Sequence, residues 1–213
     1  MADAVLRPYQ PGDRDAVYDI CLRTAADGED ASPLHRDPDV VADVFAGPYV
    51  HLRPEFAFVL DDGGRTVGYV LGVPDTERFA ADLRAKWLPL VGHRHPDPNG
   101  PPADPDQEFA HLLHHPERMV RSALADYPAH LHIDLLAGYR RSGYGRRLIT
   151  MLLNALHGAG VPRVHLGMVA TNIRARAFYD RLGFTELTVP DAGQITYLGR
   201  STELSEGAAT VRT

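Results

Sequence analysis

The spacing of apolar residues alternates between two periods, which divides the chain into predicted strands and helices. Runs rich in β-formers, alternating or continuous, predict strands within residues 4–9, 55–73, 129–137, 162–169, 184–190 and 194–200. Helical spacing predicts helices within 12–25, 37–50, 77–91, 108–115, 144–157 and 173–183, with short helices in 117–127. Gly47-Pro48 is predicted to stop the second helix. The order gives an antiparallel first half and a βαβ second half, a mixed α/β (α+β) class.

Two segments carry the strongest local signals. Residues 55–73 predict a hairpin, because Asp61-Asp62-Gly63-Gly64 supplies positive φ angles between two β-rich runs. Residues 76–128 interrupt the strand pattern with helical stretches around a proline-dense loop, 92–107. We expect one domain over 1–204, with 76–128 as a helical and proline-rich insertion and 205–213 as a flexible tail.

Composition narrows the class of protein. The formal net charge of −6 over 213 residues argues against a general nucleic-acid binder, which would carry a basic face. Cys21 is the one cysteine, so no internal disulfide can form, which favours a reducing cytoplasm. No apolar run reaches the length of a membrane span, and the start "MADAVLRPYQ" has no apolar signal region. We therefore expect a cytoplasmic protein with no membrane partner.

The stretch "YRRSGYGRRLI", residues 139–149, concentrates positive charge and glycine where a strand gives way to a helix. A helix N-terminus offers free amide donors, and glycine lets a phosphate approach the backbone. Residues 141–146 are therefore candidates for binding a pyrophosphate. The plainer alternative is a glycine turn that opens a solvated basic helix. A Walker loop is excluded because Gly-Lys-Ser/Thr is absent. The dinucleotide fingerprint fits poorly, since Leu148 occupies its third small position.

A family resemblance follows from this loop. Arg140-Arg141-Ser142-Gly143-Tyr144-Gly145 resembles the R/Q-x-x-G-x-G/A loop of the GNAT superfamily of N-acetyltransferases. Residues 172–184, "NIRARAFYDRLGF", resemble that family's N-x-x-A-x-x-F-Y-x-x-x-G-F helix and turn. A narrower likeness, through "HIDLL" and "FYDRLGF…TYLGRS", is to the acetyltransferase-like domains of O-GlcNAcases and their stand-alone bacterial relatives. The resemblance implies a central mixed sheet of about seven strands, splayed in the middle and flanked by helices.

The resemblance also implies acetyl-CoA (coenzyme A) as cofactor and a small-molecule or peptide amine as acceptor. It assigns cofactor binding to the strand end, the phosphate loop and the motif helix. These residues are Leu135, Leu136, Arg140, Arg141, Ser142, Gly143, Tyr144, Gly145, Arg146, Asn172, Ala175 and Phe178. Free backbone amides around residues 134–136 would hold the acetyl and pantetheine groups. Asn172 could equally serve as a helix N-cap.

Three residues are candidates for proton transfer. Alternation along "HLHIDLL" places His130, His132 and Asp134 on one strand face, opposite a leucine face. Asp134 is the preferred base or amine-orienting group, with His132 as its rival because imidazole titrates nearer neutrality. The resemblance makes Tyr179 the candidate acid for the leaving sulfur; the alternative for Tyr179 is core packing. For Asp134 and His132, the alternative is a polar cluster whose hydrogen bonds are satisfied internally, or an exposed strand face.

Other functions stay open at this point. A non-catalytic acyl-CoA-binding or protein-interaction domain is the main alternative, and a dinucleotide-binding protein is a weaker one. His93, His95, His111, His114 and His115 invite a metal site, but neither a nearby cysteine nor His-Glu-x-x-His accompanies them, so we expect none.

The insertion has an expected place as well. Its apolar residues (Phe79, Leu83, Trp87, Leu88 and Leu90) call for burial. We expect it to narrow the acceptor cleft above His130, His132 and Asp134, with "HPDPNGPPADPD", residues 95–106, as a mobile rim. The alternative is a homodimer contact elsewhere on the surface.

Overall fold

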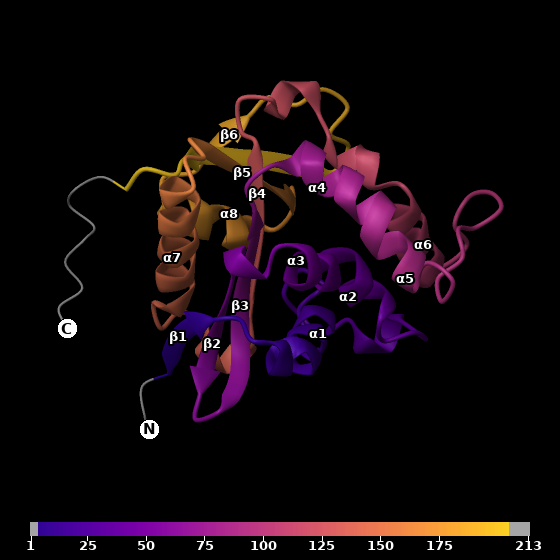
Figure 1. Ribbon diagram of the computed structural model, residues 1–213, viewed down its shortest axis with the longest axis horizontal. Helices are drawn as coiled ribbons and strands as arrows, with labels where there is room; N and C mark the ends of the chain where they lie inside the picture. The colour runs from indigo at the N-terminus through magenta and orange to yellow at the C-terminus, as the bar shows by residue number, and fades with distance from the viewer. Residues whose placement is uncertain (1–3, 205–213) are drawn as a thin grey trace.

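A seven-stranded sheet organises the part of the chain described by the computed structural model, residues 4–204 (Figure 1). The strand order is β1-β2-β3-β4-β5-β7-β6, and every adjacent pair is antiparallel except β4 and β5. The strands are β1 (Val5–Pro8), β2 (Ala57–Asp62), β3 (Arg65–Val73), β4 (Ala129–Leu135), β5 (Arg163–Val169), β6 (Thr185–Leu187) and β7 (Ile195–Ser201). The expected mixed sheet is confirmed. The predicted hairpin is β2–β3, turned at Gly63 and Gly64 with φ of 62° and 89°.

The two central strands separate soon after they meet. β4 and β5 pair only through Ala129 with Val164 and His130 with His165. On its other side, β4 stays paired with β3 from His130 to Leu135. The carboxyl half of β4 therefore has one edge without a ladder partner, and this gap between strands positions the site.

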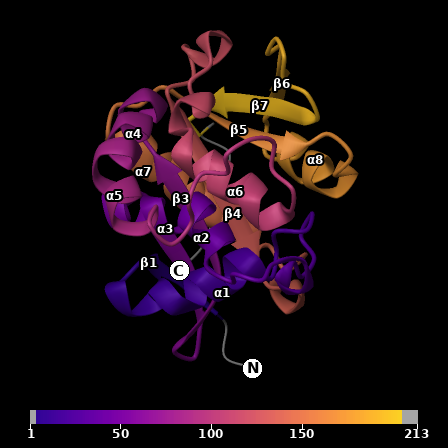
Figure 2. The same ribbon diagram turned by 90° about the vertical axis from the view of Figure 1, so that its right-hand side faces the viewer.

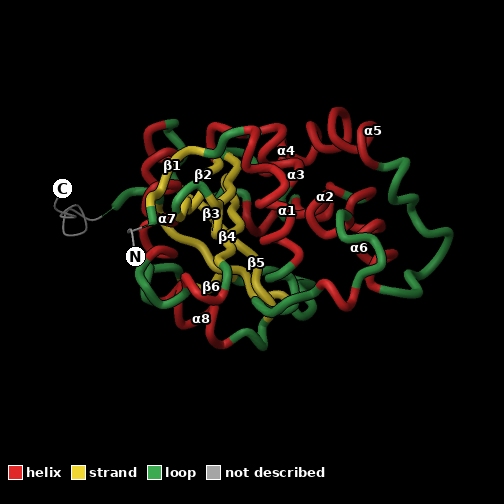
Figure 3. The backbone as a smooth tube through the Cα atoms, turned by 90° about the horizontal axis from the view of Figure 1, so that it is seen from below, coloured by secondary structure: helices red, strands yellow, loops and turns green. Residues whose placement is uncertain are grey.

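Helices cover both faces of the sheet. They are α1 (Arg14–Leu22), α2 (Val40–Phe45), α3 (Gly47–Leu52), α4 (Thr76–Asp82), α5 (Leu88–Val91), α6 (Pro105–His114), α7 (Tyr144–Gly158) and α8 (Ile173–Asp180). The first six lie on one face, and α7 lies on the other, as Figures 1 and 3 show. One prediction needs correction: Gly47-Pro48 ends α2 but also opens α3, because proline is favoured in the first turn of a helix.

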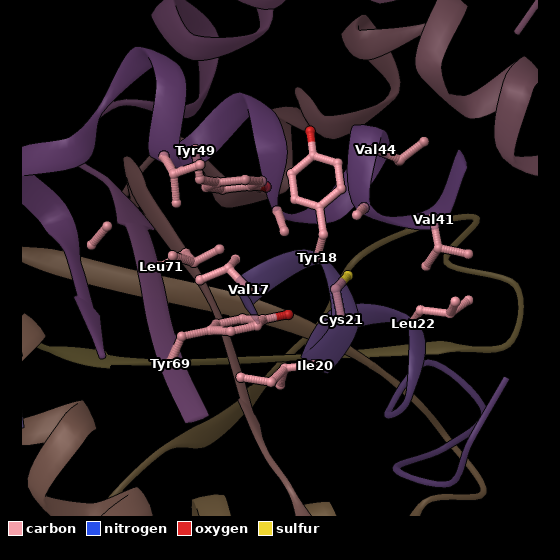
Figure 4. Close-up of a cluster of buried hydrophobic side chains, with 14 of the residues drawn as sticks. Val17, Tyr18, Ile20, Cys21, Leu22, Val41, Val44, Tyr49, Tyr69 and Leu71 are labelled. Atoms are coloured by element: carbon pink, nitrogen blue, oxygen red, sulfur yellow. The ribbon is translucent and has the colours of Figure 1, made fainter. Parts of the chain in front are cut away.

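Two hydrophobic cores result from alternation along the strands. Tyr69 and Leu71 of β3 point into the core under α1–α3, where Cys21 and Tyr49 also lie (Figure 4). Val70 belongs to the opposite core, which α7 closes with a stripe of buried leucines and one isoleucine. Fully burying such a side chain contributes about 1.5–3 kcal/mol. The leucine face of β4 packs in this second core, as its alternation predicted.

The insertion joins two neighbouring strands, β3 and β4, and folds mostly as helix. Phe79, Leu83 and Trp87 are buried as expected and Leu88 is partly buried, but Leu90 is 52% exposed. A π-helical turn over Leu83–Trp87 is the reason, since its extra residue rotates the next turn and buries Val91 instead.

The proline-dense loop is shorter than predicted. Asp104 caps α6 by accepting a hydrogen bond from the Gln107 amide at 2.9 Å, and Pro105 starts the helix. The loop therefore ends at Ala103. The loop extends away from the sheet at the edge of the molecule (Figure 3), and Figure 2 shows it beside α6. Residues 205–213, the predicted tail, lie outside the described residues. Between residues 4 and 204, no helix is long and apolar enough to span a bilayer.

Candidate active site

The predicted phosphate loop has the backbone geometry of an anion cradle. Arg141 and Gly143 both have positive φ, 63° and 83°, which turns the chain sharply before α7. A side chain on Gly143 would meet nothing within 4 Å, so the space in front of it is open. The first amide bonded at this end of α7 is that of Arg147, to the Gly143 carbonyl at 3.2 Å. The amides of Gly145 and Arg146 lack an intrahelical partner, as at any helix start.

Gly145 lines the cleft and also has a packing role. A Cβ at Gly145 would lie 3.1 Å from the Phe178 ring, so this glycine lets α7 approach α8. Phe178 and Ala175 of α8 also line the cleft described below. Asn172 accepts a hydrogen bond from the Ala175 amide at 3.0 Å, which makes it the N-cap of α8 beside the cleft.

The end of β4 offers fewer free amides than expected. The Leu136 amide donates to the Val67 carbonyl at 3.0 Å, so the expectation that it holds the cofactor is wrong. Antiparallel pairing then directs the Asp134 amide to β3 as well. The amides of Ile133 and Leu135 point to the unpaired edge and are the available donors. Ile133 was not predicted.

Arg140 lines the cleft and also stabilises the loop. Its Nε donates to the Leu135 carbonyl at 2.8 Å, and another guanidinium nitrogen donates to the Gly28 carbonyl. Arg140 therefore ties the end of β4 to the segment after α1. Arg141 and Arg146 line the cleft with Arg174 and Arg181 of the α8 region. Ser142 and Tyr144 are not among its lining residues: the Ser142 hydroxyl donates weakly to Arg140, and Tyr144 packs beside Tyr139.

A cleft of about 1180 Å³ runs through the gap between β4 and β5. Its lining includes the loop residues Gly143 and Gly145 at one end and His132 and Asp134 of β4 further along. Phe109 of α6 also lines it, so the insertion borders the cleft as expected. No residue of the predicted rim, 95–106, lines it, so that expectation is wrong: the insertion borders the cleft through Phe109 of α6.

Asp134 faces the cleft and is held by Tyr69. The Tyr69 hydroxyl donates to Asp134 Oδ2 at 2.7 Å. Burial raises the pKa of Asp134 above its usual value, although the Tyr69 hydrogen bond acts in the opposite direction. Cys21 of α1 lies beside them in the cleft, and burial raises the pKa of its thiol to about 12. The Cys21 thiol is therefore protonated at neutral pH.

Tyr179 lines the same cleft from α8. Its ring packs against Phe178 and Phe184, with centroids 5.1 and 5.4 Å away, so the core-packing alternative holds for the ring. Burial raises the pKa of the Tyr179 hydroxyl, and the charge of Asp134 adds to that shift. The hydroxyl is thus a neutral donor whose acidity depends on Asp134.

A chain of hydrogen bonds fixes the tautomers of the strand histidines. The Thr76 hydroxyl donates to the Pro128 carbonyl at 2.8 Å, so its oxygen accepts from His130 Nδ1 at 2.8 Å. His130 Nε2 therefore accepts from the Tyr49 hydroxyl at 2.7 Å. The Tyr49 oxygen in turn accepts from His132 Nε2 at 3.0 Å. His132 keeps the Nδ1 lone pair, which has no partner within residues 4–204. Burial lowers the pKa of His132 to about 4.

Comparison with known proteins decides the family. A sequence model of the acetyltransferase (GNAT) family matches residues 104–184. The crystal structure of SsHAT is 59% identical, with a TM-score of 0.92, and the alignment covers 95% of this chain and all of that one. The chain belongs to the GNAT acetyltransferase family.

Two curated relatives cover different shares of the chain. Protein O-GlcNAcase of Rattus norvegicus is 28% identical over 200 residues, 92% of this chain. The chain spans only 22% of that protein's length. The [ribosomal protein bS18]-alanine N-acetyltransferase of Escherichia coli K12 is 33% identical over 70 residues, 33% of this chain and 47% of that one.

GNAT proteins use acetyl-CoA, and the residues of this cleft fit it. The space in front of Gly143 is open, α7 directs its N-terminal amides there, and arginines line that end of the cleft. The amides of Ile133 and Leu135 are placed for the acyl portion.

Several residues of this GNAT site could not be located from the sequence. Cys21 lines the cleft, and Tyr69 and Tyr49 hold its lining residues Asp134 and His132 from segments distant in sequence. Tyr69 pairs with Asp134 in the β3–β4 ladder, which no local pattern specifies. Alternation along β4 identified His132 and Asp134, and the family motif identified Tyr179.

The insertion histidines are partly brought together. His111 and His115 stack one helical turn apart, and Asp97 accepts from them at 3.1 and 3.2 Å. These three could supply metal ligands. His95 and His114 are bonded elsewhere, to Asp43 and to the His95 carbonyl. Because the imidazole groups already have a carboxylate partner, the absence of a metal stays our prediction.

Proposed function

We propose that this GNAT protein transfers the acetyl group of acetyl-CoA directly to a primary amine of a small molecule or peptide. One observation supports this most: a single cleft joins the amides of the α7 start to Asp134 and His132 through the gap between β4 and β5. Acetyl-CoA supplies the acetyl group as a thioester. Gly143, Arg141, Arg146 and the first turn of α7 would hold its phosphates, and the Ile133 and Leu135 amides its acyl portion.

Asp134 is proposed as the base. An amine must lose a proton to attack, and its conjugate acid is bound well by a carboxylate. Because burial raises the pKa of Asp134 toward neutrality, this carboxylate accepts a proton more readily than an ordinary one. The Tyr69 hydrogen bond orients it. His132 is proposed to orient the amine through its Nδ1 lone pair, since burial makes it a weak base.

Tyr179 is proposed to donate the proton that the leaving sulfur needs. Its hydroxyl lines the cleft and is neutral. The Ile133 and Leu135 amides would stabilise negative charge on the carbonyl oxygen. Direct transfer is favoured over an acyl-enzyme, because the one cysteine of the chain, Cys21, is a buried thiol with a pKa of about 12.

The E. coli relative, whose name makes it an alanine N-acetyltransferase, supports an amine acceptor. The alternative is an acyl-CoA-binding or interaction domain without turnover. Incubation with acetyl-CoA and an amine library, followed by mass spectrometry, should identify acetylated amines. In a competition assay, coenzyme A should displace bound acetyl-CoA, and NAD should not. Tight binding of acetyl-CoA with no acetylated amine in the library would favour the non-catalytic alternative.

A further inference from the structure

A second, smaller cavity of about 180 Å³ adjoins the cleft on the insertion side. The two spaces share His132 and the β5 residues Leu166 and Gly167. Its other polar lining comes from Tyr49, Thr76, His130, His165, Tyr197 and Arg118. Among the described residues that line this cavity, none is a carboxylate and Arg118 is the one arginine or lysine.

Arg118 carries a charge that the protein does not neutralise. Its Nε donates to the Leu112 carbonyl at 3.3 Å, and within residues 4–204 its guanidinium makes no ion pair. The adjacent Glu117 is engaged elsewhere, with Arg84 at 2.5 Å and His115 at 3.2 Å. A largely desolvated guanidinium without a carboxylate is costly, so the site favours an anionic ligand.

The neighbours of Arg118 do not supply a negative charge. The hydroxyl groups of Tyr49 and Thr76 are committed to the chain of bonds that holds His130 and His132. His165 donates from Nδ1 to the Tyr127 carbonyl at 2.8 Å, which leaves its Nε2 as an acceptor only. Arg121 nearby adds a second positive charge, and its buried Nε has no partner in the described chain.

We propose that this cavity binds a carboxylate of the acceptor through Arg118, so that the acceptor is a small amine bearing a carboxylate a few atoms from its nitrogen. The inference rests on the proposed function, because it places the amine at Asp134 and His132 in the adjoining cleft. A guanidinium binds a carboxylate through two parallel hydrogen bonds, and this selects for an acid over an amide or a bare alkyl chain.

Matched acceptors test the proposal. β-Alanine and 4-aminobutyrate should be acetylated with kcat/KM on the order of ten- to a hundredfold above propylamine, butylamine and the two carboxamides, as charged hydrogen bonds imply. Arg118→Met should remove that preference, mainly by raising KM for the acids, while the alkylamines keep their rates. Arg118→Lys should keep part of the preference.

Arg78→Met is the matched control. Arg78 also belongs to the insertion, but it is exposed and does not line either cavity. This variant should keep the acid preference. Equal rates for acids and alkylamines in the wild type would overturn the proposal. So would an equal loss for both acceptor classes in folded Arg118→Met.

A failed transfer reaction can be distinguished from a failed subsite. If no amine is acetylated, calorimetric titration of 4-aminobutyrate into the protein saturated with coenzyme A tests the subsite alone. Binding in the wild type and in Arg78→Met, with at least tenfold weaker binding in Arg118→Met, would support it. Absence of 4-aminobutyrate and β-alanine binding to the wild type would overturn it.

Discussion

At the scale of single residues, Tyr179 carries the sharpest prediction. Tyr179→Phe keeps the ring that packs between Phe178 and Phe184 and removes only the proton donor. Steady-state kinetics should show kcat lower by about ten- to a thousandfold, with little change in acetyl-CoA affinity. Tyr139→Phe is the control, since its hydroxyl donates to Asp62 and it does not line the cleft. Full activity of Tyr179→Phe would leave this residue a packing role alone.

Asp134 links activity to pH and to stability. Because the folded state raises the pKa of Asp134 above 3.8, its protonated form is favoured by folding. The resulting stabilisation is present below the unfolded pKa and is lost as pH rises through the folded pKa. The Asp134→Asn variant has no carboxyl group to titrate at this position. Its melting temperature relative to that of the wild type should therefore increase as pH rises from the unfolded to the folded pKa of Asp134.

The same Asp134→Asn variant should lose most of kcat and the acidic limb of the pH–kcat/KM profile. Cys21→Ala is a control nearby, because its thiol is protonated at neutral pH and should not contribute to that limb. An unchanged acidic limb in Asp134→Asn would transfer the role of base to His132.

At the scale of elements, the turn before α7 is predicted to bind the cofactor phosphates. Gly143→Val should weaken acetyl-CoA binding at least tenfold in calorimetry. A β-branched residue is strained at φ 83°, and its side chain would project into the open space proposed for the phosphates. Gly138→Val is the matched control, since it lies just before the loop without positive φ and with nothing within 4 Å. Equal affinity of the two variants would contradict the assignment.

The insertion is predicted to act on the acceptor through α6, not through its loop. Phe109 packs edge-on against Phe45, with centroids 5.5 Å apart, and Phe45 packs on His132. Phe109→Ala should raise the acceptor KM several-fold and spare acetyl-CoA affinity. A shortened loop lacking residues 98–102 should leave both constants unchanged, because no residue of that loop lines the site. A changed acceptor KM in the shortened loop alone would restore the rim hypothesis.

At the scale of the whole molecule, strand alternation and turn chemistry were enough to predict most of the fold. The hairpin at Gly63-Gly64, the polar face of β4 and the leucine stripe of α7 all follow from local sequence patterns. The exposure of Leu90 did not, because a single π-helical turn changes which face is buried.

Less of the site than of the fold could be predicted from the sequence. Local motifs located Gly143 and Tyr179, but the partners that set their chemistry come from distant segments. Tyr69 holds Asp134 across the β3–β4 ladder, and Tyr49 holds both strand histidines from α3. Leu136 was misassigned because strand pairing, which no local pattern specifies, uses its amide. Arg118 had no sequence signal at all.

The central claim is that this GNAT protein turns over acetyl-CoA in the presence of an amine. The most direct measurement is the rate of free thiol release from saturating acetyl-CoA, with and without a pool of carboxylate-bearing and plain primary amines. The account predicts release that depends on the acceptor, reaches many turnovers and falls strongly in Asp134→Asn. Thiol release that no amine accelerates, in wild-type protein shown to bind acetyl-CoA, would contradict it.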